Sequence, residues 1–244
     1  MLHIDINCDM GEGIGNDHLL MPYISSCSIA CGGHTGTEKS ILETISLADQ
    51  YKVKIGAHPS YPDPENFGRK SIEISNSDFT NSIKKQISLF VLCCKKNNSK
   101  IHHVKPHGAL YNDLYFNHVL VLLFLDVIKE LIPKVIIYCA PGSVLEKEAK
   151  RIGFATIREG FMDRAYNSDG TLRNRKLMDS VLIDKNQVKN QAVRFVKESR
   201  VLSYEENLIS MPIDTLCLHG DHPNALQLIQ FVNQSLKSEG IDVY

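Results

Sequence analysis

The chain has 244 residues, which is enough for one large domain with a full hydrophobic core. Lys and Arg together number 27 against 28 for Asp and Glu, so the formal net charge of -1 gives no support for a nucleic-acid or anionic-membrane partner. The first residues resemble a working strand rather than a secretion signal, and the apolar run 118–128 is too short to span a bilayer. We therefore expect a cytoplasmic protein in which this run forms a buried helix.

The seven cysteines are odd in number and lie mostly in apolar strand-like or helix-like segments. This usage predicts reduced, buried thiols rather than a disulfide framework. The chain has no Cys-x-x-Cys pair, and Cys27 and Cys31 fall on a strand-like segment, so a structural zinc site is disfavoured.

Short β-rich segments alternate with amphipathic helical segments along the chain, as in repeated βα units with a parallel sheet. We predict strands near 3–7, 27–31, 53–57, 101–105, 134–139, 154–158 and 214–218. We predict helices over 37–51, 77–97, 114–131, 143–152, 185–198 and 223–239. Seven strands in seven such units indicate a barrel, and a doubly wound open sheet is the alternative that this periodicity leaves open.

Two segments, 59–76 and 161–184, are too long for ordinary βα loops. The second contains Asp169-Gly170, a tight-turn signal that predicts a hairpin or lid. No linker between domains is visible. We therefore expect a single domain over residues 1–244 with two insertions on the loop face.

Polar residues follow several predicted strands directly. In a parallel α/β protein the carboxyl ends of the strands lie on one face, so these residues are expected to converge there. The five junctions read IDINCDMGEG, SIACGGHTG, VKIGAHPSYPD, IHHVKPHGALYN and DTLCLHGDHPNA.

The first junction places Asp5, Asn7 and Asp9 at alternate positions, so their side chains point to one side of a strand. Buried carboxylates need partners, and Asp5 is as readily explained by a structural network as by function. Glu12 lies in a glycine-rich loop whose amides can approach an anion, although the pattern is no nucleotide fingerprint.

His34 and His58 follow the next two strands, and His34 precedes a helix N-terminus where an anion can bind. Asp9, His34 and His58 also offer an Asp-His-His metal site as an alternative. The three residues are far apart in sequence, so no metal site is our first prediction.

Lys105 and His107 offer a cation for a phosphate or carboxylate and an imidazole that can move protons. Tyr111 and Asn112 follow on the first turn after them. The alternative for Lys105 is an ion pair with a structural carboxylate such as Asp5.

The later insertion supplies Asp163, Arg164 and Tyr166, which can close over a substrate or merely form surface salt bridges. His219 and Asp221 complete the ring after the last strand. P-loop, GxGxxG and GxSxG motifs are missing, so acid–base residues around a small site remain.

Several near-contiguous motifs, in order over about residues 3–240, resemble the LamB/YcsF family: DINCDMGEG, IACGGHTG, IGAHPSYPD, FGRK, HHVKPHGALYN, DRAY with DGTLRNR, and CLHGD. The chain departs from the family pattern at Gly33, where the family has an aromatic residue, and at Thr37-Glu38, where it has an acid and a proline. It also departs at Asn174, since a Val or Pro often precedes Arg175.

The resemblance implies a deformed (β/α) barrel of about seven parallel strands, akin to glycoside hydrolases and deacetylases. It implies the A subunit of an ATP-hydrolysing 5-oxoprolinase that works with subunits B and C. The implied reaction opens 5-oxo-L-proline to L-glutamate while ATP, with Mg²⁺, becomes ADP and phosphate.

The resulting catalytic candidates are Asp9, Glu12, His58, Lys105 and His107. Lys105, Arg69 and Arg164 are expected to bind the substrate carboxylate or ATP phosphates, the two histidines to move protons, and the two acids to orient water or hold Mg²⁺. Further binding candidates are Asn7, His34, Tyr111, Asn112, Tyr166, His219 and Asp221. Two alternatives stay open: a stand-alone metal-dependent amidohydrolase or deacetylase, and a non-catalytic substrate-binding subunit.

Overall fold

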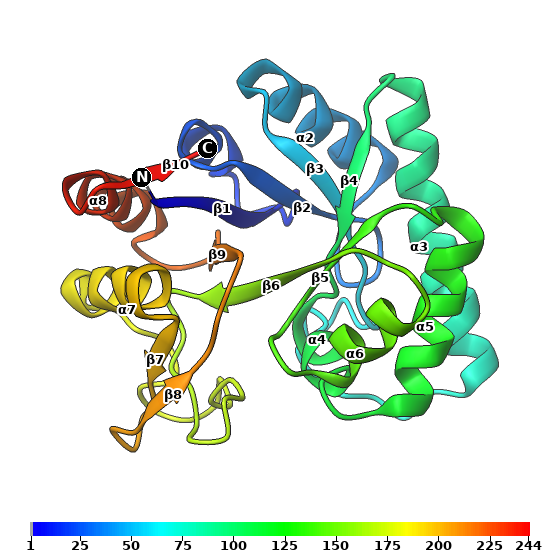
Figure 1. Cartoon of the computed structure of the whole chain (residues 1–244). Coiled ribbons are helices and arrows are strands. Elements are labelled where there is room, and N and C mark those ends of the chain that lie inside the picture. Colours follow the sequence, from blue (N-terminus) through cyan, green and yellow to red (C-terminus); the bar gives the residue numbers. More distant parts are fainter. Residues whose placement is uncertain (1) are drawn as a thin grey trace.

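Seven parallel strands close into a barrel in the computed structural model, which describes residues 2–244 (Figure 1). The barrel closes because the last of these strands pairs with the first, with Thr215 opposite Asp5. The prediction of a seven-stranded (β/α) barrel is confirmed and the open-sheet alternative is wrong. The strands are β1 (Leu2–Met10), β2 (Ser26–Ala30), β3 (Lys54–His58), β4 (Ile101–Val104), β5 (Ile136–Cys139), β6 (Thr156–Phe161) and β9 (Thr215–Leu218).

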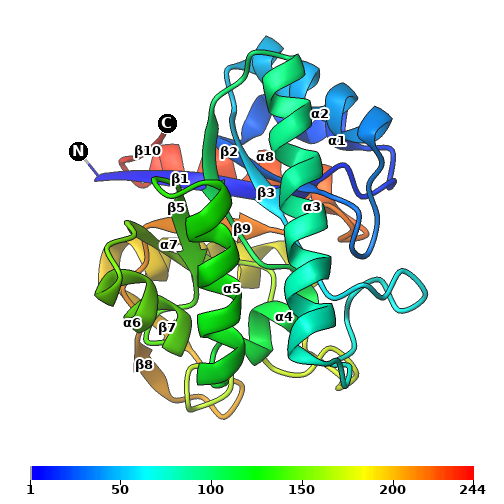
Figure 2. The same cartoon turned by 90° about the vertical axis from the view of Figure 1, so that its right-hand side faces the viewer.

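Helices surround the barrel, and the long pair α3 and α5 lie side by side on its outside (Figure 2). All six predicted helices are present: α2 (Glu38–Tyr51), α3 (Asn76–Lys96), α5 (His118–Leu131), α6 (Val144–Arg151), α7 (Lys185–Glu198) and α8 (Ala225–Ser238). Three short helices were not predicted: α1 (Asp17–Leu20), η1 (Met21–Tyr23) and α4 (Gly108–Asp113).

Helix starts follow side-chain capping. The predicted start at residue 114 is wrong, because Asn117 caps α5 by accepting a 3.1 Å hydrogen bond from the Leu120 amide. Ser75 caps α3 by accepting from the Asp78 amide at 3.1 Å. Ser143 caps α6 by accepting from the Glu146 amide at 3.1 Å. The run 118–128 lies in α5 and contributes buried apolar side chains, and within residues 2–244 no helix is long and apolar enough to cross a membrane.

Three short strands lie outside the barrel ring. β7 (Arg200–Leu202) and β8 (Leu208–Ser210) form an antiparallel pair, and β10 (Ile241–Val243) pairs with the start of β1. Each has three residues, too few to show a period in the sequence. The β1–β10 pairing brings the two ends of the described chain close together (Figure 1).

The inside of the barrel is a hydrogen-bonded polar column, whereas such interiors are usually filled by branched apolar side chains. Asp5 Oδ2 accepts bonds from Ser26 Oγ at 2.8 Å and from Thr215 Oγ1 at 2.6 Å. Asn7 Nδ2 donates to Thr215 Oγ1 at 2.9 Å. Asp5 therefore forms a buried hydrogen-bond network at the end of the column away from the carboxyl ends of the strands. Asn7 connects that network to the carboxyl ends.

All seven cysteines are free and buried, as predicted. Burial raises the pKa of each thiol above its ordinary value, to about 12 for Cys31 and Cys94.

Candidate functional site

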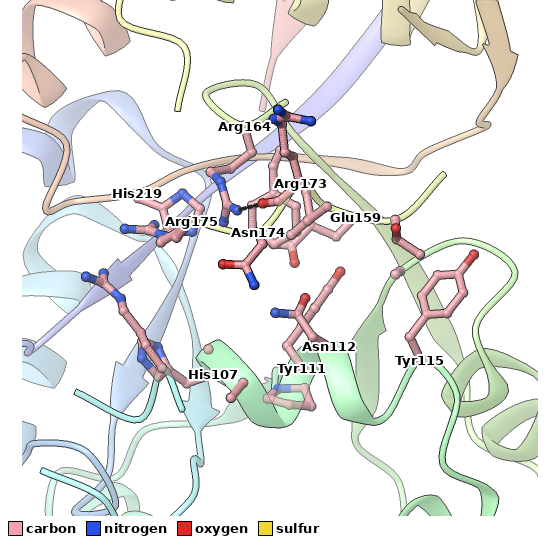
Figure 3. A pocket seen from close by; sticks show the side chains of 18 of the residues that line it. His107, Tyr111, Asn112, Tyr115, Glu159, Arg164, Arg173, Asn174, Arg175 and His219 are labelled. Atoms are coloured by element: carbon pink, nitrogen blue, oxygen red, sulfur yellow. Dashed lines mark hydrogen bonds between the residues drawn. The ribbon is translucent and has the colours of Figure 1, made fainter. Parts of the chain in front are cut away.

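A cavity of about 720 Å³ opens at the carboxyl ends of the strands (Figure 3). This volume is typical of a small-molecule site. Of the residues predicted from sequence, Asn7, Glu12, His34 and Asp221 lie outside its lining. The predicted residues that line it are Asp9, His58, Arg69, Lys105, His107, Tyr111, Asn112, Arg164, Tyr166 and His219.

Lys105 lies at the floor of the cavity with 1% of its surface exposed. Its Nζ is 2.8 Å from Asp9 Oδ1, 2.7 Å from Glu159 Oε1 and 3.0 Å from Asn7 Oδ1. Burial opposes the charge, but these acceptors outweigh it and raise the pKa of Lys105 well above its ordinary value. The alternative of a buried ion pair is present, but its carboxylates are Asp9 and Glu159 rather than Asp5, which is engaged by Ser26 and Thr215.

Two oxygens at the floor lack protein partners. Among residues 2–244, neither Glu159 Oε2 nor Tyr111 Oη has a hydrogen-bond partner, although both atoms are buried and both residues line the cavity. Burial raises the pKa of Tyr111 well above its ordinary value, so its hydroxyl remains a donor at neutral pH. Buried polar atoms are normally satisfied, so this pair is suited to a ligand that donates one hydrogen bond and accepts another.

Glu159 was missed by the sequence reasoning. It lies in β6, which continues three residues beyond its predicted end at 158. The signal was present, because Glu159 is a charged residue followed by a glycine at the end of an apolar strand, as at the other junctions.

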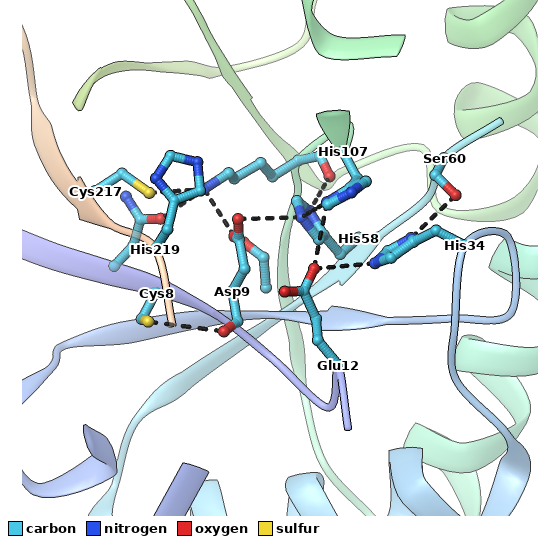
Figure 4. Close-up of polar contacts among 12 residues, drawn as sticks. Cys8, Asp9, Glu12, His34, His58, Ser60, His107, Cys217 and His219 are labelled. Carbon is cyan, nitrogen blue, oxygen red and sulfur yellow. Dashed lines mark hydrogen bonds and ion pairs between the residues drawn. The ribbon is translucent and has the colours of Figure 1, made fainter. Parts of the chain in front are cut away.

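Two histidines and two carboxylates converge beside Lys105 (Figure 4). His58 Nδ1 donates to the Lys105 carbonyl at 2.8 Å, and His107 Nε2 donates to the Phe67 carbonyl at 2.9 Å. The other nitrogens, His58 Nε2 and His107 Nδ1, face each other at 2.9 Å. Asp9 Oδ2 lies 3.3 Å from the first and Glu12 Oε1 lies 3.3 Å from the second.

His34 packs behind this cluster. Its ring stacks on His107 with centroids 3.7 Å apart, and its nitrogens meet Glu12 Oε1 at 2.9 Å and Ser60 Oγ at 3.0 Å. Burial lowers the pKa of His34 below its ordinary value. Of the alternative triad of Asp9, His34 and His58, only Asp9 and His58 are among the four converging donors, and His107 and Glu12 are the other two.

The later insertion builds one wall of the cavity. Arg164 is buried and donates to the Ser180 carbonyl at 3.0 Å and the Arg173 carbonyl at 2.6 Å. Two isolated antiparallel bridges, Arg164 with Val181 and Tyr166 with Leu172, give this segment the predicted hairpin character.

Asp163 and Tyr166 are buried as well, so surface salt bridging is the wrong explanation for this group. Asp163 Oδ2 lies 2.9 Å from His219 Nδ1, and the Tyr166 hydroxyl accepts from the Phe161 amide at 2.8 Å. Burial of Asp163 opposes its ionisation, but the attraction and hydrogen bonds of His219 prevail and lower its pKa. These buried side chains therefore form the interior of the cavity wall.

The cavity has a strong excess of cations. Seven of its lining side chains are Lys or Arg, against two carboxylates. Arg69 and Arg175 both form ion pairs with Asp221, which lies behind these two side chains and does not itself line the cavity. Arg173 and Arg175 were missed because the sequence reasoning assigned them to a turn. The excess positive charge favours an anionic ligand.

The fold and the site together define a (β/α)-barrel protein with a small-molecule cavity, cationic at its mouth and polar at its floor. The LamB/YcsF family model matches residues 4–244, and the chain belongs to this family. It is 37% identical over 247 residues, covering 99% of both chains, to the protein named as the A subunit of 5-oxoprolinase in Staphylococcus aureus strain bovine RF122 / ET3-1, and equally to that of strain MSSA476. The crystal structure of a lactam utilization protein from Thermus thermophilus superposes with a TM-score of 0.91 at 32% identity, covering 99% of each chain.

Proposed function

We propose that this chain acts as the A subunit of an ATP-dependent 5-oxoprolinase, opening 5-oxo-L-proline to L-glutamate together with partner subunits B and C. The names of its relatives support lactam chemistry, and the word subunit in those names supports a complex. The observation that carries the proposal is the polarity of the cavity: an unpaired acceptor and an unpaired donor at its floor, and an excess of cations around them.

This polarity matches the proposed substrate. A lactam presents its N–H and C=O on the same edge of the ring, so Glu159 Oε2 can accept from the N–H while the Tyr111 hydroxyl donates to the carbonyl oxygen. The substrate carboxylate would then face the cationic side of the cavity near Arg69 and Arg175. Lys105 fixes Glu159 and Asp9 instead of binding the substrate carboxylate, since its ammonium already faces three oxygen acceptors.

ATP is required in this proposal because an unstrained five-membered lactam resists hydrolysis. Transfer of the γ-phosphoryl group to the lactam oxygen releases ADP, and water then adds to the activated ring carbon. The C–N bond breaks, the nitrogen takes a proton, and a second water releases phosphate from the acyl phosphate to leave glutamate. His58 and His107 lie at the cavity and are placed to move these protons. The cationic lining offers positions for the phosphates of Mg-ATP.

The test is 5-oxoproline-dependent ATP hydrolysis and glutamate formation by the chain reconstituted with its partner subunits. Glu159→Gln and Tyr111→Phe keep shape and remove one floor contact each, so each should lower kcat/KM for 5-oxoproline by about 10- to 100-fold. Lys105→Met should lower it at least as far, because two carboxylates lose their cation.

Lys147→Met, at an exposed lysine of α6, is the matched control and should leave the rate unchanged. Unchanged rates in all three floor variants would contradict the assignment and favour a subunit that does not touch the substrate. Ring opening by the chain alone without ATP would favour the amidohydrolase alternative instead.

A further inference from the structure

We propose that Asp9, Glu12, His58 and His107 form a binding site for one divalent transition-metal ion. One donor atom from each residue, two imidazole nitrogens and two carboxylate oxygens, lies within 4.8 Å of all the others. All four residues are buried, with 1–7% of their surface exposed. This inference goes beyond the proposed function, which assigns Mg²⁺ only to the ATP phosphates. When the ion is bound, the free nitrogens of His58 and His107 are ligands, so the two rings would hold the ion instead of moving protons.

The hydrogen-bond partners of His58 and His107 show which of their ring nitrogens bear hydrogens. A carbonyl oxygen can only accept, so the nitrogens facing the Lys105 and Phe67 carbonyls bear hydrogens. In the neutral rings, His58 Nε2 and His107 Nδ1 therefore both present lone pairs, and they do so toward each other at 2.9 Å. Two lone pairs at this distance require a positive centre between them, which is either a single proton or a metal ion.

Two of the separations among the four atoms match those of ligands on a metal ion. Ligands on a tetrahedral ion with bonds of about 2.0–2.1 Å lie about 3.3 Å apart. His58 Nε2 to Asp9 Oδ2 and His107 Nδ1 to Glu12 Oε1 are both 3.3 Å. A small outward movement of the two rings would bring their facing nitrogens to the same separation.

The surroundings also resemble the outer shell of a metal site, where ligating histidines donate their second N–H to a carbonyl and ligating carboxylates are held by further bonds. Both rings make the carbonyl bond here, Lys105 holds Asp9 Oδ1, and His34 holds Glu12. The Phe67 carbonyl is aimed at His107 by a left-handed backbone with φ of 54°, a conformation that costs energy for a non-glycine residue.

The donor set indicates the class of ion. Imidazole ligands suit Zn²⁺, Fe²⁺ or Ni²⁺ and carboxylates suit Mn²⁺, whereas Mg²⁺ prefers oxygen ligands alone and retained waters. An ion here would border the cavity through Asp9, His58 and His107, which line it, while Glu12 anchors it from behind.

The test uses the full chain alone, so its result is independent of the partner subunits and of the proposed reaction. Protein stripped with chelator is titrated with Zn²⁺, Mn²⁺ and Mg²⁺ by calorimetry, and the bound metal is counted by mass spectrometry after dialysis. Roughly one equivalent of Zn²⁺ or Mn²⁺, with Mg²⁺ at least about tenfold weaker, is expected. Co²⁺ loading should give ligand-field absorption bands.

His107→Ala should weaken binding by at least about 100-fold, and His34→Gln, which removes the ring that supports Glu12 and stacks on His107, by about 10- to 100-fold. His118→Ala, at an exposed histidine of α5, is the matched control and should bind as the unaltered chain does. If the unaltered chain retains no Zn²⁺, Mn²⁺ or Co²⁺, the proposal is wrong and a shared proton joins the two rings. Undiminished binding by His107→Ala would also overturn it. The titration of the unaltered chain keeps the test decisive if that variant does not fold.

Discussion

Gln86 occupies the space that a side chain at position 33 would need. A Cβ atom on Gly33 would lie 2.2 Å from Ser60 Oγ and 2.4 Å from Gln86 Oε1. Gln86 instead bonds both backbone groups of Ser60, accepting from its amide at 3.0 Å and donating to its carbonyl at 2.9 Å. Since Ser60 in turn meets His34, the lack of a side chain at Gly33 leaves room for a polar clamp that supports the histidine cluster.

His103 is a second residue whose buried state has a measurable consequence. Its ring is fully buried inside the barrel, stacked on Tyr138 with centroids 3.9 Å apart and 3.0 Å from Ser28 Oγ. Burial, together with repulsion from His102 and Lys105, lowers the pKa of His103 well below its ordinary value. The imidazole is therefore neutral in the folded chain at pH values where it is charged in the unfolded chain.

We predict that the free energy of unfolding falls as the pH drops below about 6.5, because the unfolded chain then binds protons that the folded chain does not. His34 and His107, whose pKa values are also lowered by burial, act in the same direction. Denaturant unfolding at about pH 7.5 and about pH 5.5 measures the loss. In His103→Gln the loss should be smaller by about 1 kcal/mol, and in His118→Gln it should be unchanged. An equal loss in all three proteins would exclude His103 as a contributor.

At the scale of single elements, the side chain of Arg164 helps to hold together the cavity wall formed by residues 162–184. Arg164 bonds two carbonyls of its own segment, while its backbone carbonyl accepts from Gln191 Nε2 of α7 at 2.8 Å. The tip of the segment, residues 176–179, is exposed. The wall is thus fastened at its base to α7 and free at its tip.

Arg164→Met should release this wall, because the Arg173 carbonyl loses its donor at a cost of about 1–3 kcal/mol, while the Ser180 carbonyl keeps only the Ala165 amide. Limited trypsin digestion should then cut near Lys176 at least about tenfold faster than in the unaltered chain. Arg200→Met, at an exposed arginine of β7, is the control and should digest at the original rate. Equal rates for both variants would mean that the rest of the hairpin holds the wall without Arg164.

At the scale of the whole molecule, the barrel was predictable because most of its strands are short apolar runs separated from the next by an amphipathic helix. The three-residue strands and the short helix α4 were not, since elements this short show no period in the sequence. The expectation that polar residues following parallel strands converge on one face correctly placed Asp9, His58, Lys105 and His107 together.

The order of strands could not predict which atoms of these side chains contact one another at the site. The facing nitrogens of His58 and His107 and the ion pair of Lys105 with Glu159 join residues about 50 positions apart, through side-chain rotamers that only the packed barrel determines. The sequence therefore predicted the membership of the site better than the role of each member.

The rates at which the buried cysteines react with a thiol reagent report how often each part of the chain unfolds. They are spread over the barrel strands β1, β2, β5 and β9, the turn after β2 and helix α3, and thiols with raised pKa values inside a packed core react only when that part of the chain opens. An aromatic disulfide reagent should modify none of the seven in the native protein within minutes and all seven in denaturant. A fast-reacting thiol in the native protein would contradict this and identify a region that opens on its own. The order in which the slow thiols react would trace the path by which the barrel comes apart.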